Sequence, residues 1–407
     1  MKRFFIITIL CLSCAMGFAQ WEDAMDFYDA DTVNIEIDND YFMPLHKAKR
    51  KYNWYAEQAC AWQRVVEADP KNENAWRNFF FASYHYEANN WHDFDFINHK
   101  DSSQTAVVMR KMKAAIPNTY IFNLCASLFW LKEWGEIDKN VVINALDYGM
   151  YSIHVEVLRS LTYKLWEIDH DNELLSRAFR ELYERRYFPE RIMAYGWNLM
   201  LGMKDSAVYV ANTSRDYEQM ILMQEVFNAR KDITIIPCSA IKSKAFRDYI
   251  SKRLNIKPFV TDPNEVLTDE QRNTLFIRDL YGQRNQPVYL PMNIGYYSYL
   301  DRDSIYNEGL LLKYSTKRYD NISVARHNFK DVYELEYLTQ PDYVYDNWKE
   351  SDYVDRNIIF CVTKMADKFA QFGYKDDAKR LENFIGKVFR RDEMRAVSRL
   401  QYHQRWW

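Results

Sequence analysis

Polar side chains that could bind a ligand gather in one short loop of this chain. Residues 212–218 read NTSRDYE and lie between a β-rich run and a helical pattern. Loops at the carboxyl ends of parallel strands bind ligands in open α/β sheets, and the start of a following helix favours anions. Asn212, Ser214, Arg215 and Asp216 are therefore the candidate ligand-binding residues.

The same residues also have a purely structural interpretation. A Thr or Ser followed by Asp before a helix is a common N-terminal cap, and we expect capping more than ligand binding here. The loop contains no Gly. Its backbone therefore does not match the phosphate-binding turns of P-loop and dinucleotide-binding proteins.

Other chemical patterns are weaker. His85, His92 and His99 recur at seven-residue steps in a segment rich in Asn and Asp, and residues 38–40 read DND. The histidines do not have established metal-ligand spacing, and the acidic triplet lacks the Gly and closing Glu of a calcium loop. No motif of a known hydrolase, metalloprotease or nucleotide-binding enzyme occurs. We therefore expect no catalytic residue, no metal and no cofactor.

Four cysteines remain once a leader sequence is set aside. Cys60, Cys125, Cys238 and Cys361 each lie among apolar neighbours, far apart along the chain and without C-x-x-C spacing. We expect them to be small buried hydrophobic residues. One disulfide would be compatible with an exported chain, but the sequence does not select a pair.

The composition indicates a globular, largely helical protein. Of 407 residues, 48% are hydrophobic and 27% charged, with only 10 Gly and 10 Pro. Few turn-forming residues favour long helices over short strands joined by tight turns. The net charge of -3 argues against a nucleic-acid partner, because such proteins carry an excess of basic residues.

The N-terminus is typical of a secretory signal peptide. Lys2 and Arg3 precede the apolar run 4–12, which is too short to span a bilayer, and small residues follow at 17 and 19. We predict cleavage after residue 19; lipid attachment at Cys14 is the alternative. The mature chain is expected to have no transmembrane segment and to be periplasmic or associated with the cell envelope.

Helical patterns follow an acidic leader at 20–45 and fill residues 46–204. The spacing of Trp62, Pro70 and Trp76 resembles a tetratricopeptide repeat, in which Pro turns the chain between helix pairs. A similar pattern returns in the C-terminal region 331–407, where Gly373 is expected to let two helices approach closely and Ala378 to fill their crossing. A basic, aromatic tail ends the chain.

Residues 205–330 have a different character and predict an α/β domain. Buried strands are expected at 207–211, 233–238 and 286–292, with a final strand within 307–318. Helices are expected at 217–230, around 241–250 and after Thr268, which forms a capping-box pair with Gln271. The order β-α-β-α-α-β implies a small, mostly parallel sheet with right-handed crossovers.

The stretch 212–239 resembles part of a family of bacterial membrane proteins. Asn212, Asp216, the Gln-Glu-Val run 224–226 and Asp232 match the soluble C-terminal region of glycosyltransferase-like, protein O-mannosyltransferase-related proteins of unknown function. The likeness covers roughly residues 205–390. This chain departs from the Gly- and Asp-rich loop at residues 213–215 and lacks the membrane helices. The resemblance therefore implies a shared exported module without the transferase activity.

Together these features predict a mainly α protein with an inserted α/β unit, in which helical repeats flank a three-layer sheet. The expected function is a non-catalytic scaffold that presents helical-repeat surfaces to a protein or glycan of the cell envelope. The alternative is an enzyme or accessory protein that handles glycans through the loop around Asp216.

Overall fold

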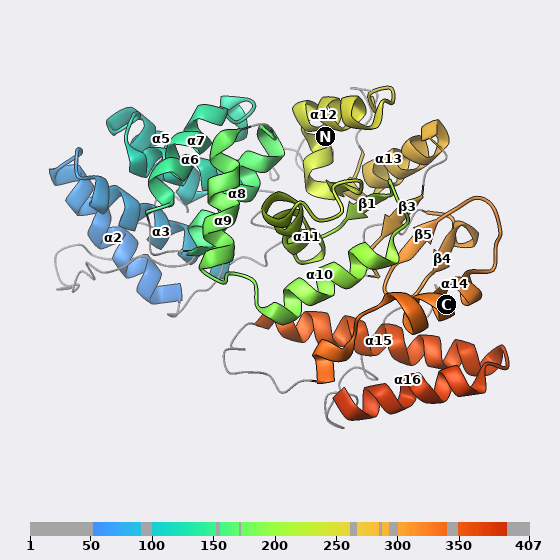
Figure 1. Cartoon of the computed structure of the whole chain (residues 1–407). Helices are drawn as coiled ribbons and strands as arrows, with labels where there is room; N and C mark the ends of the chain where they lie inside the picture. Colours follow the sequence, from blue (N-terminus) through green and yellow to red (C-terminus); the bar gives the residue numbers. More distant parts are fainter. Residues whose placement is uncertain are drawn as a thin grey trace, which may run out of the picture. The chain divides into compact units, whose positions relative to one another are not determined.

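Figure 1 presents the computed structural model of the chain, in which the described residues are 52–90, 100–151, 155–170, 172–260, 267–284, 287–292, 300–339 and 349–388. Within these ranges the protein is mainly helical and carries a small mixed β-sheet. Two compact units divide the chain, Met1–Lys164 and Leu165–Trp407. The predicted signal peptide, Cys14, the acidic leader with residues 38–40, His92, His99 and the tail lie outside the described residues.

The first unit is built from helices. Its elements are α2 (Tyr52–Ala68), α3 (Glu73–Asn90), η1 (Lys100–Ser102), α5 (Gln104–Ala115), α6 (Tyr120–Leu128), η2 (Lys132–Trp134), α7 (Lys139–Gly149) and most of α8 (Val155–Ile168). The Asp-Pro break predicted from the sequence separates α2 from α3, which pack against each other. Trp76 Nε1 donates a hydrogen bond to the Pro70 carbonyl, 2.9 Å away, so the second helix is fixed to the turn that begins it.

The core of this unit is aromatic and also contains the carboxyl group of Glu87. Large buried side chains include Tyr55 and Trp62 from α2 and Phe80 from α3. The buried carboxylate of Glu87 on α3 accepts hydrogen bonds from the Gln104 backbone N–H and from the backbone N–H and hydroxyl of Thr105. These donors belong to the first turn of α5, whose N–H groups have no partner within their own helix. Glu87 therefore ties α5 to α3.

The second unit surrounds the sheet with helices. Its helical elements are α9 (Glu173–Glu184), α10 (Glu190–Gly202), α11 (Ser214–Phe227), η3 (Cys238–Lys242), α12 (Lys244–Leu254), α13 (Asp269–Arg284), η5 (Arg302–Ser304), α14 (Asn321–His327), η6 (Asn328–Val332), η7 (Glu336–Thr339), α15 (Lys349–Gln371) and α16 (Lys375–Val388). The expected capping box at the start of α13 is confirmed, because Thr268 and Gln271 exchange hydrogen bonds of 2.9 and 3.2 Å.

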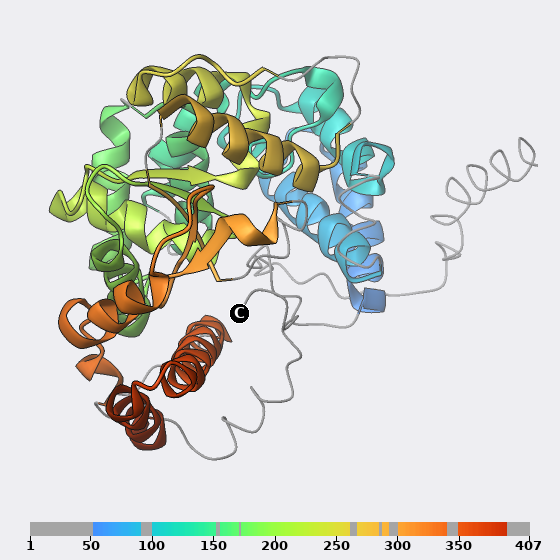
Figure 2. The same cartoon turned by 90° about the vertical axis from the view of Figure 1, so that its right-hand side faces the viewer.

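The described strands form a five-stranded sheet in the order β2-β1-β3-β5-β4. They are β1 (Val208–Ala211), β2 (Thr234–Pro237), β3 (Val288–Leu290), β4 (Ile305–Asn307) and β5 (Leu312–Tyr314). β1 pairs in parallel with β2 and β3, as the sequence predicted. Helices α12 and α13 cover one face and α10 and α11 the other (Figures 1 and 2). The crossover from β1 to β2 through α11 and the crossover from β2 to β3 through α12 and α13 run in opposite directions along the sheet, which places their helices on opposite faces.

The strand predicted within 307–318 is confirmed as β5, but the sequence did not predict β4 or the antiparallel pairing. β4 and β5 form a hairpin, and β5 also pairs antiparallel with β3. Gly309 has a φ of +117°, and its N–H donates to Asn307 Oδ1 at 2.8 Å, which turns the chain. An Asn two residues before a Gly is a turn signal. The sheet is therefore mixed rather than mostly parallel.

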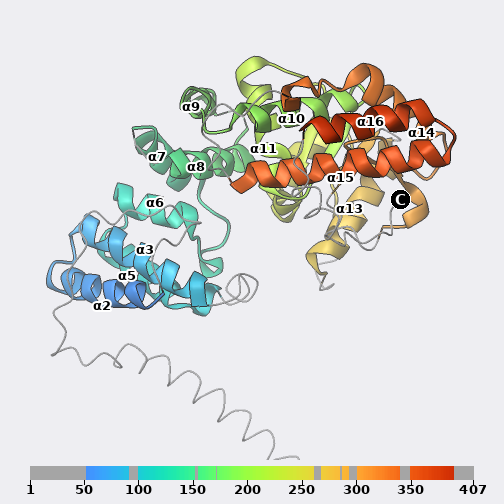
Figure 3. The same cartoon turned by 90° about the horizontal axis from the view of Figure 1, so that it is seen from below.

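Helices α15 and α16 form an antiparallel pair beside α10 (Figures 1 and 3). Ala378 of α16 is buried, and its filling of the helix crossing stays a prediction, but the role predicted for Gly373 is wrong. A Cβ on Gly373 would meet nothing within 4 Å, and its φ is +83°. Gly373 therefore serves the left-handed turn that ends α15 and does not bring helices together. None of the described helices combines the length and apolar character needed to cross a bilayer.

A close helix approach does occur elsewhere, at Gly196 on α10, and it gives a prediction. A Cβ there would lie 2.5 Å from Gln219 Cγ and 3.1 Å from Met223 Cε of α11. Gly196→Ala should lower the free energy of unfolding by about 1–3 kcal/mol, because the packed helices must separate. Gly386→Ala is the matched control: it meets nothing within 4 Å inside α16 and should raise stability by up to about 1 kcal/mol. Urea unfolding that gives both variants the same sign would contradict this packing.

Candidate functional site

The loop that the sequence singled out lies at a favourable position in the sheet. It follows the carboxyl end of β1, and β1 has parallel neighbours on both sides. Such a position is a topological switch point, where connections leave in opposite directions and a crevice opens.

The candidate residues of this loop form the start of a helix. Helix α11 begins at Ser214 and not at the predicted residue 217, with Thr213 as its N-cap. Asp216 is 1% exposed, and its Oδ2 accepts hydrogen bonds from the backbone N–H and the hydroxyl of Thr213 at 2.9 and 3.1 Å. The capping that the sequence favoured is confirmed. Arg215 is exposed, and Asn212 and Ser214 are half-buried. A ligand-binding role for the four residues stays a prediction.

A second polar cluster lies in the turn of the β4–β5 hairpin. The carboxylate of Glu308, 1% exposed, accepts hydrogen bonds from the hydroxyls of Tyr289 at 3.0 Å and Tyr319 at 2.6 Å and pairs with Lys313 at 3.4 Å. Burial, and then the nearby Glu308 charge, raise the pKa of both tyrosines. Each carboxylate oxygen has a partner, so the cluster is a satisfied structural network.

A small cavity lies at the opposite end of the sheet from the loop. It has a volume of 190 Å³ and is lined by ten residues, which come from α8 and the residues after it, α11, the loop before β2, β2 and α12. The ring of His170 stacks on that of Tyr249, with centroids 3.5 Å apart and planes 12° apart, and Trp166 meets His170 edge-on at 4.7 Å. No sequence motif indicates this site, because its residues come from separate elements.

His170 is the unusual group in this cavity. Both of its ring nitrogens are enclosed, and neither has a hydrogen-bond partner among the described residues. Burial, and then the positive charge of Arg253, lower the pKa of His170 to about 4, while Asp169 acts in the opposite direction. At neutral pH the ring is therefore uncharged, with one nitrogen available as a donor and the other as an acceptor.

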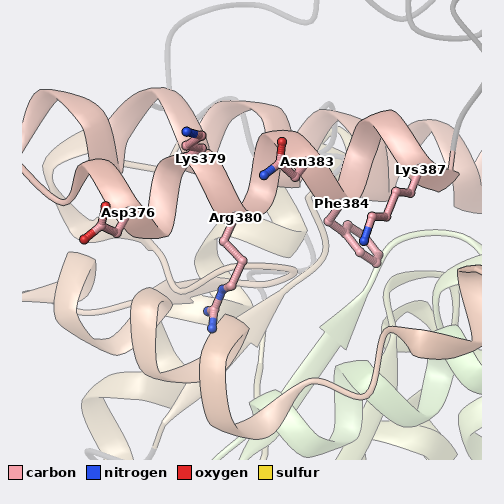
Figure 4. Close-up of a pocket in the computed structure, with 6 residues that line it drawn as sticks. All are labelled: Asp376, Lys379, Arg380, Asn383, Phe384 and Lys387. Carbon is pink, nitrogen blue, oxygen red and sulfur yellow. The ribbon is translucent and has the colours of Figure 1, made fainter.

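An open concavity runs along α16. It has a volume of 460 Å³ and is lined by Asp376, Lys379, Arg380, Asn383, Phe384 and Lys387. Figure 4 shows Arg380, Phe384 and Lys387 on one edge of the helix and Lys379 and Asn383 on the other. The spacing of three, four and seven residues places the whole set on one side of α16. Its three cations outnumber its single carboxylate.

The predicted histidine pattern is only partly described, whereas all four cysteines are described. His85 is buried in α3, and the other two histidines of its pattern lie outside the described residues. Within the described ranges no three His, Cys, Asp or Glu side chains gather closely enough to hold a metal ion. The four cysteines are free; three are buried and Cys60 is half-buried.

The capping contact at Asp216 gives a stability prediction. Asp216→Ala should lower the free energy of unfolding by about 0.5–2 kcal/mol, because Thr213 and the first turn of α11 lose their acceptor. Asp216→Asn keeps an acceptor oxygen and should cost less. Chemical denaturation measures both. Equal losses for the two variants would show that charge, and not the cap geometry, is what matters at this position.

The lowered pKa of His170 predicts a pH dependence. An unfolded histidine titrates near pH 6.5, so the unfolded chain binds more protons than the folded chain between about pH 6.5 and about pH 4. Stability should therefore be full above that window and fall by up to about 3 kcal/mol as the pH drops through it. His170→Phe should remove this part of the loss. Parallel wild-type and variant stability curves between pH 4 and 7 would contradict the assignment.

Comparison of the chain with protein-family models, with curated proteins and with solved structures finds no match in any of the three. The resemblance of residues 212–239 to a membrane-protein family therefore rests on those residues themselves.

Proposed function

We propose that this protein is an exported, non-catalytic binding protein of the bacterial cell envelope, which presents helical surfaces to a partner. The N-terminal signal-peptide pattern supports export. The packed helix pairs α2–α3 and α15–α16 support the interpretation of TPR-like units, since Pro70 lies in the turn between α2 and α3, as expected. The resemblance to the soluble region of the transferase-like family supports a module that works outside the membrane.

The groove along α16 is the observation that carries this proposal. Lys379 and Lys387 lie in it without an ion-pair partner among the described residues, and the half-buried ring of Phe384 lies between them along the helix. A positive, partly apolar, open surface is complementary to an acidic segment that also carries an apolar side chain. The groove fits such a segment better than it fits a neutral molecule.

The dimensions favour a protein segment over an anionic glycan. Lys387 follows Lys379 by eight positions on the helix, which is about 12 Å along the axis. Roughly four residues of an extended peptide cover this distance, so two carboxylates can reach the two lysines while a side chain between them contacts Phe384. The Asn383 side-chain amide offers both a donor and an acceptor to a peptide backbone.

A second function is favoured by the position of the 212–216 loop. A switch point of parallel strands is where α/β proteins bind small ligands, and a glycan-handling enzyme or accessory protein would use Asn212, Ser214, Arg215 and Asp216 there. The capping contact already occupies Asp216 Oδ2, which weakens this alternative. It predicts that a neutral oligosaccharide binds and that Asp216→Asn abolishes the binding.

Charge reversal in the groove tests the proposal. Fluorescence anisotropy should show that a labelled glutamate-rich peptide containing one tyrosine binds the wild type, and that Lys379→Glu with Lys387→Glu weakens binding at least about tenfold. Added salt should weaken the wild type in the same direction. Lys375→Glu, an exposed change on α16 outside the groove, is the matched control and should bind nearly as the wild type does.

Two outcomes would contradict the proposal that the partner is an acidic peptide. One is equal affinity of the wild type and the double variant for the peptide. The other is a higher affinity of the wild type for an anionic polysaccharide than for the peptide at the same ionic strength. If the double variant also loses that binding, the partner is a glycan.

A further inference from the structure

The cavity beside His170 contains polar groups that the rest of the fold does not use. Two enclosed nitrogens without a partner are costly, since a buried polar group left unpaired loses about 1–3 kcal/mol. Tyr249 and Trp166 hold the ring in place by stacking and edge contacts, and they do not supply the missing hydrogen bonds. A ligand that forms hydrogen bonds with these two ring nitrogens would remove that cost.

Two cationic side chains, Arg253 and Lys231, line the same cavity. The three guanidinium nitrogens of Arg253 donate hydrogen bonds to the Thr234 hydroxyl at 3.3 Å, the Tyr249 hydroxyl at 3.4 Å and the Lys231 carbonyl at 3.0 Å. A guanidinium has five N–H donors, so two remain. Lys231 Nζ lies 4.0 Å from Glu225 Oε2, a weak and half-exposed pair.

The charge balance of the cavity favours an anion. Among the described residues that line the cavity, Glu225 carries the negative charge and Lys231 and Arg253 carry positive charges. The volume of 190 Å³ is below the roughly 300–1,000 Å³ of sites for drug-sized molecules. The buried side chains of Ile235 and Ile250 complete a lining that is otherwise mainly polar.

We propose that this cavity is a binding site for a small oxyanion, a carboxylate or a phosphate, held by Arg253 and Lys231 with the His170 ring donating a hydrogen bond. The site is separate from the α16 groove and from the loop after β1. Binding an anion beside His170 favours protonation of its second nitrogen, so the affinity should rise as the pH falls below neutral.

Anion titration of the full chain tests the site. Inorganic phosphate and acetate are the two probes, each compared with chloride at the same ionic strength, by thermal unfolding and calorimetric titration. At least one probe should raise the melting temperature of the wild type and give saturable binding. Lys231→Gln should weaken that binding about tenfold or more. Lys252→Gln, an exposed neighbour outside the cavity, is the matched control and should leave it unchanged.

His170→Phe separates a ligand site from a cavity that holds only water. Phenylalanine keeps the aromatic stacking and removes both unpartnered nitrogens, so the ligand-free variant should unfold at a higher temperature than the wild type while losing the anion-dependent shift. In the wild type, histidine ring resonances should report a higher pKa for His170 when the anion is bound. No saturable binding of either probe, or the same anion response in His170→Phe and Lys231→Gln as in the wild type, would overturn the proposal.

Discussion

The architecture of the second unit depends on one buried carboxylate. Glu308 lies in the hairpin turn, yet its side chain bonds to Tyr289 of β3 and to Tyr319, which follows β5. Its backbone carbonyl accepts from Asn328 Nδ2 at 2.7 Å and from the Tyr333 hydroxyl at 3.3 Å. A charge can remain in a dry interior only where such donors surround it. This network joins the antiparallel hairpin to the parallel strands and therefore fixes the sheet on which the loop and the cavity are built.

The difference between local signals and long-range contacts explains which parts of the fold the sequence could predict. Strands 207–211 and 233–238 are continuous apolar runs because helices cover both faces of a parallel sheet, and this local signal was sufficient. The hairpin was missed because its signal is the single turn Asn307-Glu308-Gly309, and its stabilising partners lie 11 to 25 residues away. The start of α11 was placed three residues late, since Thr213 and Asp216 resemble loop residues until they are seen capping a helix.

The candidate sites also differ in how far the sequence could predict them. The loop after β1 was predictable, because strand order and polar composition are visible in the sequence. The His170 cavity was not, because Tyr249 and Arg253 come from a helix that follows β2, and their meeting with His170 is a product of tertiary packing. The α16 groove could be predicted only in part. Its cations recur at helical spacing, but only the structure shows which side of α16 is buried against α15 and which remains open. We propose binding rather than conversion as the role of these surfaces.

Hydrogen–deuterium exchange of the full chain with a saturating acidic peptide would test this account most directly. The two competing sites lie on separate peptides, one within Lys375–Val388 and the other within 212–219. The account predicts slower exchange along α16 and no change at the start of α11. Protection confined to 212–219, with α16 exchanging as it does in the free protein, would contradict it.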